Sequence, residues 1–264
     1  MLSWLRSWLI EPGVRHLDVD SPGFTLAHRA VLQSKTMLRH LFERFYHECH
    51  SMDLHYFGDC PGRRLEIGSG SGFVKQIYPE VITSDIKPLP LVDAILRAEK
   101  IPFPNNSLRA IYAINVFHHL PKPSAFLEEL LRVLHPGGGV VLIEPYYGWL
   151  ARRLYKNLHE TEDFDMDAPG WETGTYMGPF SNANQALSYV VFKRDYAQFE
   201  QKFSQLELLW VKPHTHLLYF ISGGVNFRQL APDSLFPLVE LTQQLLSPFN
   251  QWIALQHTIV LRKR

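Results

Sequence analysis

A glycine-rich turn between two apolar stretches constrains the fold of this chain most strongly. Residues 65–67 have the character of a buried strand end, and Gly68, Gly70 and Gly72 follow them at alternate positions. Residues 73–77 then have the character of a helix start. Glycine lets backbone N–H groups approach a ligand without an intervening Cβ atom. The stretch therefore predicts a strand–turn–helix unit that binds a ligand against its backbone.

Strand and helix patterns alternate along the rest of the chain. Residues 110–116 are apolar on both faces, which is typical of a central strand in a parallel sheet. A helical apolar stripe follows at 124–134. Alternation at this spacing predicts a doubly wound α/β fold. The other expected strands lie at 81–85, 91–96, 140–144, 206–211 and 257–261.

The pattern predicts a single domain over residues 1–264, since no internal repeat or low-complexity tract divides the chain. A long helix is expected at 25–50, covering one end of the sheet. A long insertion follows the fifth strand, where it would lie over the carboxyl end of the sheet. The expected parts are an N-terminal helical cap (1–58), a ligand-binding core (59–144), a lid insertion (145–205), and C-terminal strands and a helix (206–264).

Composition excludes several classes of protein. The 26 basic and 26 acidic residues cancel, so a nucleic-acid-binding surface is not expected. Cys49 and Cys60 lack a C-x-x-C spacing and a neighbouring His/Cys cluster, so no metal site is predicted. Two cysteines fit a reducing, cytoplasmic compartment. No apolar run is long enough for a membrane-spanning helix.

The N-terminus carries an apolar stripe of two tryptophans. Trp4, Leu5, Trp8 and Leu9 would share one face of a helix. The stripe could pack back on the domain. Alternatively, it could make a peripheral membrane contact, as interfacial helices do.

The glycine spacing separates two kinds of nucleotide-like ligand. A dinucleotide fingerprint, G-x-G-x-x-G, requires a third glycine at the position that Phe73 occupies. The chain has Glu66-x-Gly68-x-Gly70-x-Gly72 instead. The spacing therefore disfavours a nicotinamide-dependent oxidoreductase.

Several further blocks follow the glycine loop in a fixed order. With the loop itself, the blocks are Leu65–Gly72, Ser84-Asp85-Ile86, Ala98–Pro104, Asn115–Leu120 and Arg132–Gly138. Together they resemble the class I S-adenosylmethionine-dependent methyltransferases of the methyltransferase type 11 group. The resemblance implies a Rossmann-like, seven-stranded, mostly parallel sheet, with S-adenosylmethionine as the cofactor.

The resemblance and the placement of polar residues give a set of cofactor-binding candidates. Asp85, at the tip of the second strand, is placed to accept both ribose hydroxyls. Asn115 can meet the amino-acid end of the cofactor, and Glu66 can order the loop or reach the ammonium through water. The full set is Glu66, Gly68, Ser69, Gly70, Gly72, Asp85, Ile86, Ala98, Glu99 and Asn115.

Two arginines depart from the pattern of the family. Arg97 stands where an Asp commonly lies beside the adenine amino group, and arginine cannot accept that hydrogen bond. The backbone of Ala98 or the side chain of Glu99 could contact adenine instead. Arg109 also replaces a common Asp, and we expect it to face solvent at the start of a strand.

The acceptor side is less constrained by the sequence. A general base is required only if the nucleophile must lose a proton. The acidic run at 160–167 is expected to be a solvated loop. The glycine turn at 222–226 is expected to be a plain strand-to-loop connection, with closure on the acceptor as the alternative. The candidates for a base are His118, His119, Glu144, Tyr146 and His159, and those for an aromatic lid are Trp149, Tyr155, Trp171, Tyr176 and Phe180.

These features predict a methyltransferase that acts on a small-molecule or lipid-like acceptor under an aromatic lid. The two arginine departures keep open an alternative, a non-catalytic binding or scaffold protein on the same fold.

Overall fold

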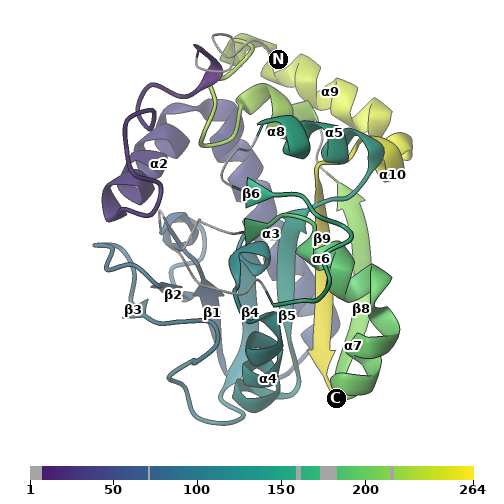
Figure 1. Ribbon diagram of the computed structural model, residues 1–264. Coiled ribbons are helices and arrows are strands. Elements are labelled where there is room, and N and C mark those ends of the chain that lie inside the picture. Colours follow the sequence, from purple (N-terminus) through teal and green to yellow (C-terminus); the bar gives the residue numbers. More distant parts are fainter. Residues whose placement is uncertain (1–7, 71, 159–161, 173–182, 215–216) are drawn as a thin grey trace.

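A seven-stranded sheet forms the centre of the protein (Figure 1). The computed structural model describes residues 8–70, 72–158, 162–172, 183–214 and 217–264. The strands run in the order β3-β2-β1-β4-β5-β9-β8. Their bounds are β1 (Arg63–Ile67), β2 (Ile82–Asp85), β3 (Ala94–Ile95), β4 (Leu108–Ile114), β5 (Leu134–Pro145), β8 (Leu206–His214) and β9 (Gln256–Lys263).

The sheet confirms the predicted Rossmann-like, mostly parallel architecture. The first five strands pair in parallel, and β9 is antiparallel to both β5 and β8. The strand order reverses between β1 and β4. The turns that follow these two strands therefore meet at the carboxyl edge of the sheet, where such folds bind ligands.

Helices cover both faces of the sheet. Alternate side chains of β4 enter two different cores: Ala110 and Tyr112 pack against α3, whereas Ile111 and Ala113 pack toward α4. The second half of the insertion belongs to the α4 layer, because its apolar side chains join the same core. The helices are α2 (Pro22–Ser34), α3 (Thr36–Phe57), α4 (Pro123–Val133), α6 (Leu187–Tyr189), η3 (Val190–Arg194) and α7 (Tyr196–Lys202).

The single helix expected at 25–50 is wrong, because two helices meet at Lys35. Lys35 has an extended backbone, with φ −99° and ψ 107°. Its ammonium donates to the carbonyls of Ser222, Gly224 and Phe227 and lies 3.0 Å from a carboxylate oxygen of Glu11. This tertiary contact outweighs the local helical pattern. The resulting α3 lies across a face of the sheet rather than over one end.

The expectation that Arg109 faces solvent is also wrong. Its guanidinium is buried and donates to a carboxylate oxygen of Asp53 at 2.6 Å and to the Cys60 carbonyl at 2.7 Å. Asp53, on α3, is fully buried and also accepts from Arg64 at 2.5 Å and from Tyr112 at 2.8 Å. The two arginines and the tyrosine thus attach α3 to β1 and β4.

This buried network gives a stability prediction. Asp53→Ala leaves two guanidinium groups without their carboxylate and should lower the free energy of unfolding by about 3–5 kcal/mol. Asp59→Ala, at an exposed carboxylate beyond the end of α3, should change it by less than about 0.5 kcal/mol. Urea denaturation of the two variants measures both values. Equal stabilities would contradict a structural role for Asp53.

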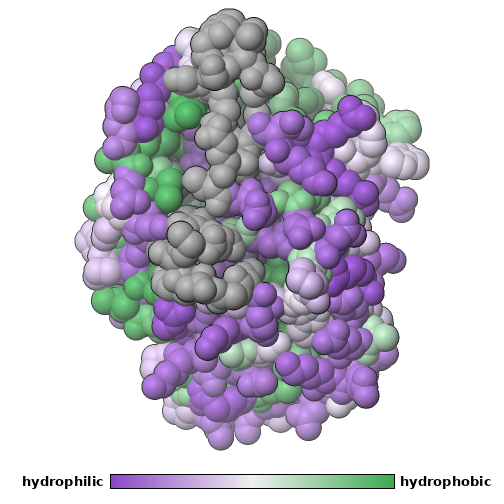
Figure 2. All heavy atoms as spheres, viewed as in Figure 1, coloured by the Kyte–Doolittle hydropathy of each residue, from purple (hydrophilic) through white to green (hydrophobic). Residues whose placement is uncertain are grey.

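The remaining elements lie around the carboxyl edge of the sheet and beside it. Figure 2 shows hydrophobic residues over α9 and α10, where Leu238, Leu241 and Trp252 are exposed. Among the described residues, no helix has the length and apolar character needed to cross a membrane. The remaining elements, in chain order, are η1 (Phe73–Gln76), η2 (Phe117–His119), α5 (Trp149–Leu158), β6 (Glu162–Asp163), β7 (Ala183–Asn184), α8 (Leu217–Ser222), η4 (Asp233–Leu235), α9 (Phe236–Leu246), η5 (Ser247–Phe249) and α10 (Asn250–Ile253).

The N-terminal stripe falls only partly within the described residues. Trp4 and Leu5 lie outside them, and Trp8 is exposed with the Arg228 guanidinium over its ring. The peripheral membrane contact stays a prediction.

Candidate functional site

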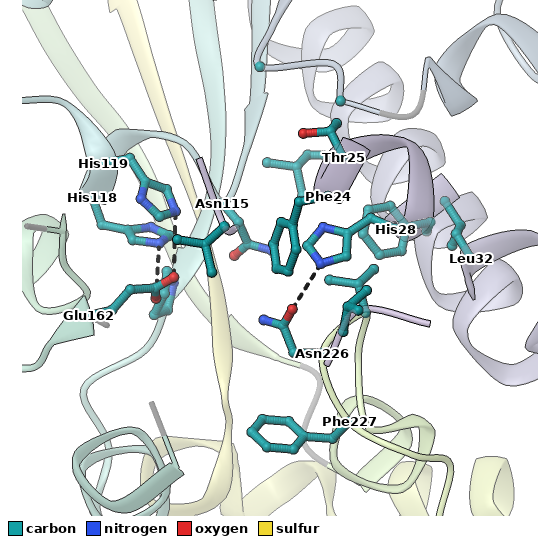
Figure 3. Close-up of a pocket in the computed structure, with 18 of the residues that line it drawn as sticks. Phe24, Thr25, His28, Leu32, Asn115, His118, His119, Glu162, Asn226 and Phe227 are labelled. Atoms are coloured by element: carbon teal, nitrogen blue, oxygen red, sulfur yellow. Dashed lines mark hydrogen bonds and ion pairs between the residues drawn. The ribbon is translucent and has the colours of Figure 1, made fainter. Parts of the chain in front are cut away.

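A pocket of about 360 Å³ opens at the carboxyl edge of the sheet, between the glycine loop and the N-terminal helices (Figure 3). One wall comes from the ends of β1 and β4. The opposite wall comes from α2 and α3, and residues from the insertion and from the segment after α8 close the sides. The cofactor and base candidates that line this pocket are Glu66, Gly68, Ser69, Gly70, Asn115, His118 and His119.

The glycine loop has the backbone that the sequence predicts. Gly68, Gly70 and Gly72 all have positive φ angles, of 69°, 47° and 64°. A Cβ atom on Gly68 would lie 2.4 Å from a methyl group of Val116, so no side chain fits there. The Ser69 amide donates to the Ser84 carbonyl at 2.8 Å, which ties the loop to β2. The loop is thus a fixed backbone cradle beside the pocket.

Asp85 stabilises the glycine loop through hydrogen bonds to the backbone. Its two carboxylate oxygens accept from the backbone amides of Gly70 at 2.9 Å and Lys87 at 3.0 Å. Each oxygen keeps a further lone pair for a ligand hydroxyl. The Lys87 ammonium donates to the Ser21 carbonyl and to the Thr25 hydroxyl, which joins this edge to the start of α2.

Two buried oxygens on the pocket wall have no hydrogen-bond partner among the described residues. One is Oε2 of Glu66, whose Oε1 accepts from the Tyr46 hydroxyl at 2.7 Å. Burial raises the pKa of Glu66 to about 7, against the opposing effect of the Tyr46 hydrogen bond. The other is Oδ1 of Asn115, a residue held at φ 55°. Because buried acceptors are normally paired, these two oxygens fit a ligand that brings N–H or O–H donors.

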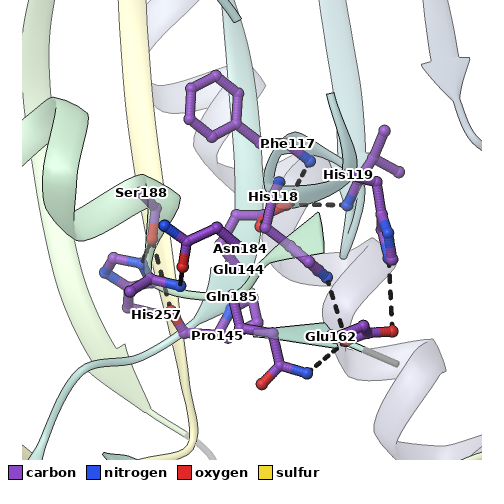
Figure 4. A network of polar contacts seen from close by, with 12 residues as sticks. Phe117, His118, His119, Glu144, Pro145, Glu162, Asn184, Gln185, Ser188 and His257 are labelled. Atoms are coloured by element: carbon purple, nitrogen blue, oxygen red, sulfur yellow. Dashed lines mark hydrogen bonds and ion pairs between the residues drawn. The ribbon is translucent and has the colours of Figure 1, made fainter. Parts of the chain in front are cut away.

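A carboxylate organises the loop after β4 (Figure 4). Glu144 is fully buried and accepts from the amides of Val116 at 2.9 Å and Phe117 at 2.8 Å. It also lies 2.6 Å from Nδ1 of His118. Burial lowers the pKa of His118, but the Glu144 carboxylate outweighs that effect and holds the pKa above its usual value. Glu144 does not line the pocket itself, so it positions His118.

The other base candidates differ in their placement. His119 lines the pocket beside His118, with their ring centroids 4.1 Å apart. Tyr146 is buried between Tyr147 and His257 and does not line the pocket. His159 lies outside the described residues.

The residues expected on the adenine side, Ala98 and Glu99, lie in the segment after β3, and Gly72 and Ile86 lie at neighbouring turns. These four candidates do not line the pocket. Ala98 is buried, and Glu99 has a carboxylate oxygen 3.5 Å from the Arg97 guanidinium. The side chain of Arg97 is about half exposed. The roles of Ala98 and Glu99 in adenine binding stay predictions.

The aromatic lid is built differently from the expectation. Trp149 is exposed beside Arg153, and Trp171 is buried in the core, where its indole N–H donates to Asp195. Of the aromatic lid candidates within the described residues, Tyr155 alone lines the pocket. Tyr176 and Phe180 lie outside those residues. The aromatic side chains that line the pocket are Phe24, Phe42, Tyr46, Tyr155, Tyr219 and Phe227.

Several polar pocket residues were not predicted, because no local motif marks them. Nε2 of His28 lies 2.9 Å from Oδ1 of Asn226, and burial lowers the pKa of His28 to about 4. Glu162 comes from the acidic run that was expected to be solvated, yet it faces His118 and His119. The turn that carries Asn226 therefore contributes to the pocket rather than only connecting two elements.

Comparisons with known proteins agree with this geometry. Residues 65–142 match the family model of the methyltransferase domain. A 58-residue stretch is 43% identical to the sterol 24-C-methyltransferase ERG6B of Gibberella zeae, covering 22% of this chain and 14% of that protein. The chain thus matches only a small part of that relative's length.

Solved structures of methyltransferases are similar to this chain at low sequence identity. A SAM-dependent methyltransferase from Archaeoglobus fulgidus superposes with a TM-score of 0.50 at 12% identity, over 84% of this chain and 94% of that one. Geranyl diphosphate C-methyltransferase from Streptomyces coelicolor A3(2) gives a TM-score of 0.48 at 12% identity, over 97% and 91% of the two chains.

The glycine cradle, the strand order and the matched segment define the class of this protein. Residues 65–142 match a methyltransferase domain, and the sheet has the Rossmann-like fold of the class I S-adenosylmethionine-dependent methyltransferases. The cofactor of this family is S-adenosylmethionine, and the two unpaired oxygens of Glu66 and Asn115 fit its amino-acid end.

Proposed function

We propose that the protein transfers a methyl group from S-adenosylmethionine to a small-molecule or lipid-like acceptor. One observation carries the proposal. The glycine cradle, with the unpaired oxygens of Glu66 and Asn115, opens into the same pocket as a wall of apolar side chains. A donor site and an apolar acceptor site would therefore share one pocket.

The cofactor would be held by residues at the ends of three strands. The backbone of the loop from Gly68 to Gly70 would lie against it, Asp85 would accept from its ribose, and Glu66 and Asn115 would meet its ammonium group. When bound, the cofactor supplies an electrophilic methyl group on a sulfonium. The protein then needs chiefly to position the acceptor and exclude water.

The acceptor would lie against α2 and the segment after α8. Phe24, Leu32 and Phe227 line this side, which favours a molecule with an apolar body. His118 and His119 face it from the sheet edge (Figure 3). They supply the polar contacts that would orient a reacting heteroatom or accept its proton.

The cofactor site gives a direct prediction at Asp85. Asp85→Ala removes the expected ribose acceptor and the carboxylate that caps the Gly70 amide. We expect the dissociation constant for S-adenosylhomocysteine to rise at least tenfold, because a charge-assisted hydrogen bond contributes about 1.5–3 kcal/mol. Calorimetry measures it, with Asp59→Ala as the control. An unchanged constant would exclude Asp85 from ribose binding.

Glu66 should make cofactor binding depend on pH. Its pKa of about 7 means that it is largely protonated at pH 6 and largely ionised at pH 8. A cationic ammonium favours the ionised form, so affinity for S-adenosylhomocysteine should rise by up to about tenfold across this range. Glu66→Gln should abolish that dependence. A wild-type profile that is flat, or that Glu66→Gln leaves unchanged, would refute the assignment.

Methyl transfer itself is tested with labelled S-adenosylmethionine. The protein is incubated with methyl-labelled cofactor and fractions of an organic extract, and label in the organic phase is counted. Transfer to an apolar fraction supports the proposal. Cofactor binding without transfer to any fraction would favour the scaffold alternative, which the exposed Arg97 in place of an acid keeps open.

A further inference from the structure

We propose that His118, His119 and Glu162 form a binding site for a divalent transition-metal ion on the wall of this pocket. The two imidazole Nε2 atoms each lie 4.0 Å from a different oxygen of the Glu162 carboxylate. One ligand atom from each of the three residues falls within 4.8 Å of the others. Figure 4 shows the two rings side by side, facing the carboxylate.

These three side chains form a ligand set that transition metals favour. Two imidazoles and one carboxylate on one side of a site leave other coordination positions open. Metal–nitrogen and metal–oxygen bonds of about 2.0–2.2 Å place neighbouring ligand atoms roughly 3–3.5 Å apart. The two 4.0 Å separations therefore need to shorten by about 0.5–1 Å, and a separation of up to 4.8 Å by about 1.3–1.8 Å. Movements of this size are within reach of side-chain torsions.

A second set of contacts orients the ligands, as is usual around bound metals. Nδ1 of His118 is taken by Glu144, which leaves Nε2 as the nitrogen that faces Glu162. Glu144 is itself fixed by the amides of Val116 and Phe117. The contact with this fully buried carboxylate orients the ring of His118.

The carboxylate ligand is held in a similar way. The Gln185 side-chain amide donates to Oε2 of Glu162. Glu162 lies on β6, which pairs in parallel with β7, so that the chain after β7 brings Gln185 alongside. The side chains of His118, His119 and Glu162 are 3%, 13% and 12% exposed, which distinguishes the cluster from a solvated acidic surface.

The placement suggests a use for the metal. All three ligands line the pocket that Asn115 also lines, so the open coordination positions face the proposed acceptor space. There the ion would take an oxygen or nitrogen donor of the acceptor and orient it. This use depends on the proposed function, whereas metal binding itself does not.

The test is a metal titration of the full chain without cofactor. After dialysis against a chelator, Zn²⁺ binding is measured by calorimetry, and Co²⁺ by its visible absorption. We expect one ion per chain, with Glu162→Gln and His119→Asn each weakening the affinity at least tenfold. Asp163→Asn, at the exposed neighbour on β6, should retain wild-type affinity.

Two results would overturn the site. One is a wild-type chain that binds neither ion, and the other is binding that Glu162→Gln and His119→Asn leave unchanged. S-adenosylhomocysteine affinity of each variant is measured in parallel, both to confirm folding and to separate the two proposals. Metal binding without cofactor binding would support the metal site and refute the proposed function. Cofactor binding without metal binding would refute the metal site and leave the proposed function supported.

Discussion

Gly68→Ala is expected to lower the affinity for S-adenosylhomocysteine at least 100-fold. The added methyl group would lie 2.4 Å from a side-chain methyl of Val116, at a backbone φ of 69° that alanine rarely adopts. Relief of this overlap moves either the loop or the segment after β4. Both carry predicted cofactor contacts, and Asn115 directly precedes Val116 in the second of them.

The control for this prediction is Gly170→Ala, because a Cβ atom there meets no other atom within 4 Å. Calorimetry gives the two affinities, and urea denaturation should show a stability loss of about 1–3 kcal/mol for Gly68→Ala alone. A Gly68→Ala protein that binds the ligand as wild type does would show that the cradle does not contact the cofactor.

Glu144→Ala is expected to have the second large effect, on both stability and the site. The change removes the acceptor of the Val116 and Phe117 amides and the partner of His118. Buried donors left without an acceptor cost about 1–3 kcal/mol each, so the free energy of unfolding should fall by about 3–5 kcal/mol. Urea denaturation measures the loss.

Two further variants isolate the cause of that effect. Glu144→Gln keeps the shape and one acceptor oxygen, and should lose roughly half as much stability as Glu144→Ala. Glu128→Ala, at an exposed carboxylate on α4, should stay within about 0.5 kcal/mol of wild type. If Glu144→Ala is as stable as Glu128→Ala, the loop after β4 does not depend on this carboxylate.

Local sequence patterns were sufficient to predict the glycine turn and the sheet that carries it. Alternating apolar segments predict a doubly wound α/β sheet because parallel strands need crossover connections, and the structure confirms the sheet. The spacing of Gly68, Gly70 and Gly72 predicts a tight turn directly after β1, and all three glycines have positive φ angles there. These features depend on residues that are close in sequence.

Contacts between distant segments account for what the sequence did not predict. Arg109 was expected in solvent because no nearby residue marks a buried partner for it. Its partner, Asp53, lies far away in the sequence, on the helix before the first strand. Lys35 interrupts a helical pattern because its ammonium meets carbonyls near Ser222 and Phe227. Glu162 reaches His118 only through the pairing of two short strands. No spacing rule links such residues.

The aromatic wall shows the same limit. Apolar residues such as Trp171 were expected over the cofactor because they lie in the insertion, yet Trp171 joins the core. The wall instead takes Phe24 from α2 and Phe227 from the segment after α8. Composition identified an aromatic enclosure, but tertiary packing decides which aromatic residues form it.

The most direct test of the central claim is calorimetry of the full chain with S-adenosylhomocysteine, with NAD in a parallel titration. The glycine cradle, Asp85 and the unpaired oxygens of Glu66 and Asn115 predict one S-adenosylhomocysteine bound per chain and no heat from NAD. Binding of NAD in place of S-adenosylhomocysteine, or binding of neither, would contradict the assignment of this pocket to a methyl donor.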